Sequence, residues 1–128
     1  MLYQRDLLIA IGKTAESPAV DTMTLCEGNI IRYSVLFPAG CAGLVYVQIW
    51  LGGFQLIPWS RGYWLRGDDH LITGDTNYPV GGPPRELVMY GYNEDTANPH
   101  TVTVMLEVSP TIYGATSLEL ADLLALGA

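Results

Sequence analysis

The chain has 128 residues, which fits one domain (residues 1–128) that can bury a core without metals or disulfides. Its formal net charge is −7 with only 6 Lys and Arg residues, too few cations for a phosphate-binding groove, so we expect no nucleic-acid partner. The apolar runs are far shorter than the roughly 20 residues that cross a bilayer, so we expect no membrane-spanning helix.

Alternation of apolar and polar residues predicts short strands along most of the chain. They are expected at residues 2–12, 21–26, 30–37, 44–51, 54–58, 69–73, 86–92 and 99–108. A Glu-Gly-Asn turn separates 21–26 from 30–37, which predicts that these two strands pair as an antiparallel hairpin. Residues 59–67 are expected to form a long loop or loose hairpin, and the Gly and Pro residues of 74–84 predict a loop.

The strand at 99–108 has the clearest pattern. Its inward face is predicted to carry only aliphatic side chains, namely Val102, Val104, Leu106 and Val108. The opposite face carries Thr101, Thr103, Met105 and Glu107. These small or adaptable side chains suit a sheet face that meets another subunit at least as well as one that meets water.

About eight short strands separated by turns predict an all-β protein, an antiparallel β-sandwich or jelly roll over residues 1–110, with a small closed barrel as the alternative. A capping pattern at 116–119 and leucines at helical spacing predict a short C-terminal helix or arm at 116–127. Two placements of Leu120, Leu123 and Leu124 stay open, against the chain's own sandwich or against another chain.

Metal and redox sites are not indicated. The predicted hairpin puts Cys26 and Cys41 at opposite ends of one strand, farther apart than the roughly 7 Å that a disulfide allows, so both are expected to be free. Neither His70 nor His100 has the neighbours that a zinc site requires. We therefore predict no metal and no cofactor.

Calcium is a milder alternative, because two loops are rich in oxygen ligands. One contains Asp68, Asp69 and Asp75, and the other contains Asn93 and Asp95. Asp and Asn are also ordinary turn residues that bond their own backbone, and this structural interpretation is favoured.

No enzyme signature is present. The chain has no Gly-x-Ser-x-Gly elbow, no base beside either cysteine and no glycine-rich phosphate loop, so a non-enzymatic protein is expected. Aromatic residues cluster instead, at Trp50, Trp59, Tyr63 and Trp64. They suit the end of a core or a subunit contact, and the alternative is a carbohydrate-binding module that uses exposed Trp and Tyr rings.

Several turn and strand segments together resemble small β-sandwich virion proteins of phages and phage-like gene sets, of the head-decoration or minor capsid kind. The resemblance covers about residues 20–108. It rests on the segments FPAGCAGLVYVQI (37–49), LIP (56–58), GDD (67–69), PPREL (83–87) and YNEDTANPHTVTV (92–104).

The resemblance implies a protein that decorates or cements a capsid, associates with itself as a homotrimer or larger, and contacts a major capsid protein or similar lattice. It implies a place in the virion, assembled in the host cytoplasm; an extracellular or cell-surface place is the alternative. Our interface hypothesis joins the aromatic stretch to the C-terminal leucines. Its residues are Trp59, Tyr63, Trp64, Leu120, Leu123 and Leu124.

Overall fold

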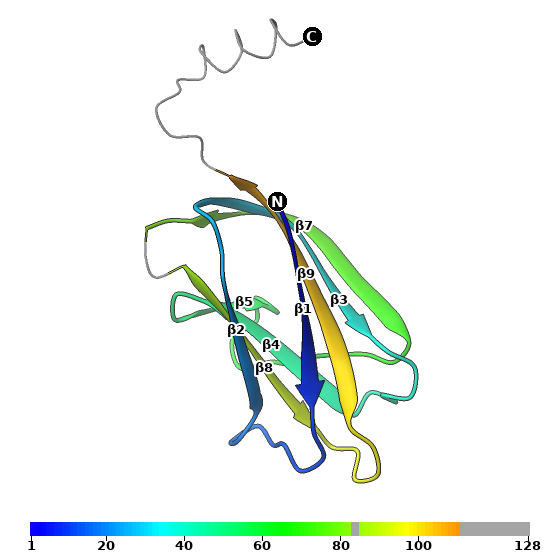
Figure 1. Cartoon of the computed structure of the whole chain (residues 1–128). Helices are drawn as coiled ribbons and strands as arrows, with labels where there is room; N and C mark the ends of the chain where they lie inside the picture. The colour runs from blue at the N-terminus through cyan, green and yellow to red at the C-terminus, as the bar shows by residue number, and fades with distance from the viewer. Residues whose placement is uncertain (83–84, 111–128) are drawn as a thin grey trace, which may run out of the picture.

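The computed structural model describes residues 1–82 and 85–110, and these form a β-sandwich of two packed antiparallel sheets (Figure 1). Sheet A has the strand order β1 (Leu2–Ile9), β9 (His100–Pro110), β3 (Gly28–Phe37) and β7 (His70–Val80). Sheet B has the order β2 (Ala19–Thr24), β8 (Glu86–Asn93), β4 (Val45–Leu51) and β5 (Phe54–Ile57), and β6 (Leu65–Arg66) also pairs with β4. The predicted all-β sandwich is therefore confirmed.

The strands pair in a nested order: β1 with β9, β2 with β8, β3 with β7, and β4 with β5. This is the pairing of a jelly roll, in which one long folded ribbon wraps around the core. The predicted hairpin of 21–26 with 30–37 is wrong, because β2 lies in sheet B and β3 in sheet A. Alternation shows which face of a strand is buried, but it does not identify the partner strand.

The core lies between the two sheets, and β9 runs through the middle of sheet A with β1 and β3 on either side. Its predicted inward residues Val102, Val104, Leu106 and Val108 are each 0% exposed, so this prediction is confirmed. On the outer face, Glu107 lies 3.7 Å from Arg32, measured between carboxylate Oε2 and guanidinium Nη1. The outer-face carboxylate of Glu107 is thus paired within the sheet.

The loop predicted at 74–84 is wrong in its first half, because β7 continues through Gly74 and Pro79 to Val80. Among the described strands, β7 pairs with β3 alone, and an edge strand tolerates a proline because its outward N–H groups need no ladder partner. Gly74 also has a packing role, since a Cβ there would lie 2.6 Å from the Tyr33 hydroxyl oxygen.

Other predicted elements have mixed outcomes. Of the two alternatives for 59–67, the loop is found at residues 59–64, and the short strand β6 that follows pairs with β4 and not within the stretch. Both cysteines are free, as predicted. The pKa of the Cys41 thiol is raised, mainly by burial and secondly by the carboxylates of Asp68 and Asp95. The helix predicted at 116–127 lies outside the described residues. Within residues 1–82 and 85–110, no helix is long and apolar enough to cross a membrane.

Candidate interaction surface

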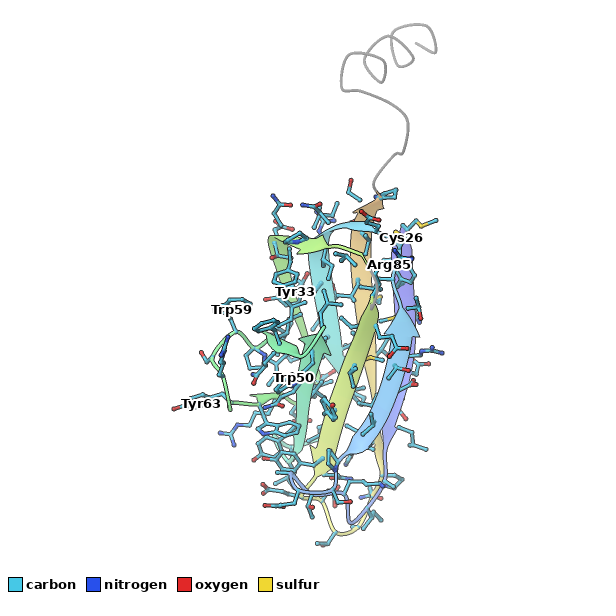
Figure 2. The ribbon with its side chains drawn as sticks, turned by 90° about the vertical axis from the view of Figure 1, so that its left-hand side faces the viewer. Cys26, Tyr33, Trp50, Trp59, Tyr63 and Arg85 are labelled. Carbon is cyan, nitrogen blue, oxygen red and sulfur yellow. The ribbon has the colours of Figure 1, made fainter. Side chains whose placement is uncertain are left out.

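The connection between β5 and β6, residues 58–64, carries large aromatic side chains into solvent, and we call it the aromatic loop. Trp59 is 67% exposed and Tyr63 is 71% exposed. Figure 2 shows both side chains on a loop that stands out from one side of the sandwich. The nearby Phe54, at the start of β5, is 55% exposed as well. Exposed large apolar groups gathered in one place typically mark a contact surface.

A buried glutamine holds the aromatic loop in place. Gln55 Nε2 donates to the carbonyl oxygens of Pro58, Ser60 and Tyr63 at 2.7, 3.2 and 3.0 Å. Gln55 Oε1 accepts the Gly62 backbone N–H at 3.0 Å. The Gln55 side chain therefore bonds the backbone along nearly the whole length of the loop.

A second glutamine fastens the loop to the centre of sheet B. Gln48 Nε2 donates to the Tyr63 carbonyl at 2.9 Å, and Gln48 Oε1 accepts the Trp50 indole N–H at 3.1 Å. Gln48 and Gln55 are buried, 6% and 4% exposed, so their hydrogen bonds are shielded from competing water. The loop is thus ordered by the protein itself, which lowers the entropy lost when it binds a partner.

The predicted interface residues do not all share this exposed position. Trp64 is half-buried, with its ring perpendicular to that of Tyr92 at a centroid distance of 4.7 Å and an angle of 83°. Tyr92 in turn stacks on Tyr46 at 4.3 Å. Trp59 and Tyr63 therefore point outward, whereas Trp64 lies against the outer face of sheet B. Leu120, Leu123 and Leu124 lie outside the described residues.

The aromatic rings over sheet B do not form a flat row. Trp50 and Tyr90 are nearly perpendicular, at 82° with centroids 6.2 Å apart, and Trp64 is perpendicular to Tyr92. A planar platform for a polysaccharide chain would need coplanar exposed rings. These rings instead line the walls of a groove.

Trp59 also borders a cleft of about 370 Å³ at one open edge of the sandwich. Its walls come from β3, β5 and β7, and its largest residues include Ile30, Tyr33, Leu56, Trp59 and Tyr78. The centres of the Trp59 and Tyr78 rings are 6.2 Å apart. Because Tyr78 belongs to β7, the exposed tryptophan also contacts sheet A.

The loop containing Asn93 and Asp95 is closed by its own hydrogen bonds. Asp95 Oδ1 accepts the backbone N–H groups of Ala97 and Asn98, and Oδ2 lies 2.8 Å from His100 Nε2. The hydrogen bond to His100, followed by the one from Ala97, lowers the pKa of the Asp95 carboxyl. Both carboxylate oxygens are therefore engaged within the turn.

Two of the other acidic candidates, Asp68 and Asp75, also have protein partners. Asp68 accepts the Gly40 N–H at 3.1 Å, and Asp75 lies 3.1 Å from the Arg32 Nε. Among residues 1–82 and 85–110, no group of three or more His, Cys, Asp and Glu side chains comes together as a metal site would require. His70 begins β7 and its side chain is exposed.

Gln48 and Gln55 are the functional residues that the sequence pattern did not identify. Gln55 lies between Phe54 and Leu56 in a short apolar strand, and that isolated polar position was the available signal. Its partners are loop carbonyls, which no residue type reveals.

No protein-family model matches the chain, and no curated protein matches its sequence. The jelly-roll pairing is shared by viral capsid proteins, lectins and other domains of unrelated function. The function is therefore argued from the surface that the fold presents.

Proposed function

We propose that this protein is a non-enzymatic virion structural protein that decorates or cements a capsid through oligomeric protein–protein contacts. One observation carries the proposal: Trp59 and Tyr63 are exposed on a loop that buried glutamines hold in place. The resemblance to phage head-decoration and minor capsid proteins supports the choice of partner, a major capsid protein or similar lattice.

Preordered aromatic side chains favour protein–protein contact. Trp and Tyr are enriched among the residues that contribute most to binding, because each buries a large area and keeps one polar group for a hydrogen bond. The Gln55 and Gln48 bonds keep the loop backbone from losing much freedom on association. The aromatic loop therefore suits a stable contact better than a transient, adaptable one.

A lattice protein that also associates with itself needs more than one contact surface. Leu36 and Leu71 supply a second exposed apolar position, since they face each other across β3 and β7 on sheet A and are 39% and 47% exposed. The proposed assembly is a homotrimer or larger, with symmetric copies that bury such positions. The proposed place of action is the virion.

The oligomeric state of the full chain tests the proposal. We expect size-exclusion chromatography with light scattering to give a trimer or larger, and we expect the protein to co-sediment with assembled shells of a phage major capsid protein. Changing both Trp59 and Tyr63 to Ala should weaken either the self-association or the binding to capsid shells by about 30-fold or more.

Leu8→Ala is the matched control, because Leu8 is 62% exposed on β1, outside the aromatic loop. This variant should assemble and co-sediment like the unchanged protein. A monodisperse monomer that binds no shell would contradict the proposal.

A further inference from the structure

We propose a separate ligand site on the outer face of sheet B that binds an acidic saccharide, a pyranose ring carrying a carboxylate. The site, which we call the aromatic groove, consists of two adjoining hollows of about 440 and 200 Å³ that share Gln48, Trp50 and Trp64. Arg61 lines the larger hollow and Tyr90 the smaller one. The larger volume is in the range of small-ligand pockets.

The rings of the aromatic groove are held rigidly. The Trp50 indole N–H donates to Gln48 Oε1, and the Trp50 ring is perpendicular to Tyr90. Trp64 is braced in the same way by Tyr92. The face of an aromatic ring is electron-rich, and the C–H groups on one face of a pyranose carry partial positive charge, so a sugar ring packs on an indole that is already in position.

The unused polar groups of the groove are mainly hydrogen-bond donors. In the described part of the chain, neither the Trp64 indole N–H nor the Tyr90 hydroxyl makes a hydrogen bond to protein, and none of the buried side-chain N or O atoms lacks a partner. Both groups are therefore within reach of solvent. A ligand with many acceptor oxygens would satisfy them.

Arg61 adds the preference for an acid. Its guanidinium lies 5.7 Å from the centre of the Phe54 ring. Arg5, Arg32 and Arg85 each pair with a carboxylate, whereas Arg61 makes no such pair within residues 1–82 and 85–110. In a chain with a net charge of −7, a cation without an acidic neighbour is available to a carboxylate from outside.

The strand pairing favours a saccharide over a peptide. Extended peptides bind by adding a strand to a free sheet edge, where unpaired backbone groups receive them. The floor of the aromatic groove is β4, which pairs with β8 on one side and with β5 and β6 on the other. Recognition here depends on side chains, as it does for a sugar with ring faces and hydroxyl groups.

Trigalacturonate is the first probe. Its binding is measured by NMR of the tryptophan indole N–H groups at ligand concentrations up to about 10 mM, a range that detects weak binding. We expect shifts of the Trp50 and Trp64 signals and little change at Trp59. The methyl ester of trigalacturonate, which differs in charge, should bind about fivefold more weakly, the contribution of one exposed ionic contact. Triglutamate, with three side-chain carboxylates but no sugar ring, should not bind.

Two variants and one control complete the test. Arg61→Gln should reduce affinity for the acid to that for the ester, and Trp64→Ala should reduce binding of both. Trp59→Ala should leave binding unchanged, because Trp59 lies outside the groove. Equal affinity for acid and ester would overturn the acidic class, binding of triglutamate would overturn the saccharide class, and no shift with any probe would overturn the site. None of these results depends on capsid assembly.

Discussion

Gln55 links the core of sheet B to the aromatic loop through four hydrogen bonds made by one side chain. Replacing it with Ala removes these bonds and leaves the Pro58 carbonyl and the Gly62 N–H without their protein partner, while the Tyr63 carbonyl keeps its bond from Gln48. We expect Gln55→Ala to lower the free energy of unfolding by about 2–3 kcal/mol. It should also speed hydrogen exchange of the Gly62 amide. Urea denaturation and exchange measurements check the two effects.

Gln4→Ala serves as the control for this substitution. Gln4 is an exposed glutamine on β1, so the same chemical change should leave stability within about 0.5 kcal/mol of the unchanged protein. If Gln55→Ala were as stable as Gln4→Ala, the aromatic loop would not depend on its buried amide.

Asp95 makes a pH-dependent contribution to the free energy of unfolding. Its pKa is lowered in the folded state, chiefly by the hydrogen bond to His100, so the unfolded chain takes up the proton first as pH falls. The contribution is complete above the ordinary Asp pKa of about 3.9 and is lost as pH falls through the lower folded value. Asp95→Asn should therefore show a flatter decline of melting temperature below about pH 5 than the unchanged protein.

Asp69→Asn is the matched comparison, since Asp69 has an exposed side chain and lies outside the Asp95–His100 turn. Its melting curves should follow those of the unchanged protein across the same pH range. Parallel declines for the unchanged protein and Asp95→Asn would show that Asp95 does not contribute in this way.

For individual strands, the alternation of apolar and polar residues predicted the buried face but not the length of the strand or its partner. The alternation in β9 identified its buried face correctly because each side chain meets the core directly. The same reasoning predicted too early an end for β7. Pro79 is tolerated because β7 is an edge strand, and Gly74 leaves room for the Tyr33 ring, and neither relation can be seen in a short stretch of sequence. The partner of β2 is β8, whose paired residues lie 62 to 72 positions farther along the chain, from Thr24 with Glu86 to Ala19 with Gly91. Only tertiary packing selects this partner.

The candidate site was predictable to a similar degree. The glycine-punctuated stretch around Trp59 and Tyr63 correctly indicated a loop, but it did not decide whether their rings would be buried or exposed. The placement of Trp64 against the outer face of sheet B depends on Tyr92, and the order of the loop depends on Gln55. The Trp64–Tyr92 contact joins residues far apart in the chain, and the Gln55 bonds go to backbone groups of the following loop, so the pattern of side chains specifies neither.

Gly28 begins β3 and pairs with Pro110 at the end of β9. A Cβ at this position would run into the Ser109 carbonyl and lie 2.8 Å from Pro110 Cα. Both are backbone atoms, so β9 itself would have to move. We expect Gly28→Ala to lower the free energy of unfolding by about 1–3 kcal/mol, measured by urea denaturation.

Gly81→Ala supplies the comparison, because a Cβ at the exposed Gly81 would meet nothing within 4 Å. It should be neutral or slightly stabilising, since alanine reduces the freedom of the unfolded chain. Equal losses at both glycines would mean that the approach of β9 to β3 is not what requires Gly28.

For the molecule as a whole, the residues that form the core are different from the residues proposed to contact other chains. Every buried hydrophobic side chain in the described part lies between Leu7 and Val108, and the two sheets cover each other along this length. The proposed contacts lie outside that core, in the aromatic loop and in the predicted C-terminal arm. Changes to these contacts should therefore alter association more than stability.

Removal of residues 111–128 tests this separation. Since the core is closed by residues 7–108, the shortened chain should melt within about 4 °C of the full chain, equivalent to less than about 1 kcal/mol. If Leu120, Leu123 and Leu124 contact another chain as predicted, light scattering should show a smaller assembly for the shortened chain at the same concentration. An unchanged assembly would assign self-association to the aromatic loop or to sheet A, whereas a large fall in melting temperature would indicate that the leucines pack on their own sandwich.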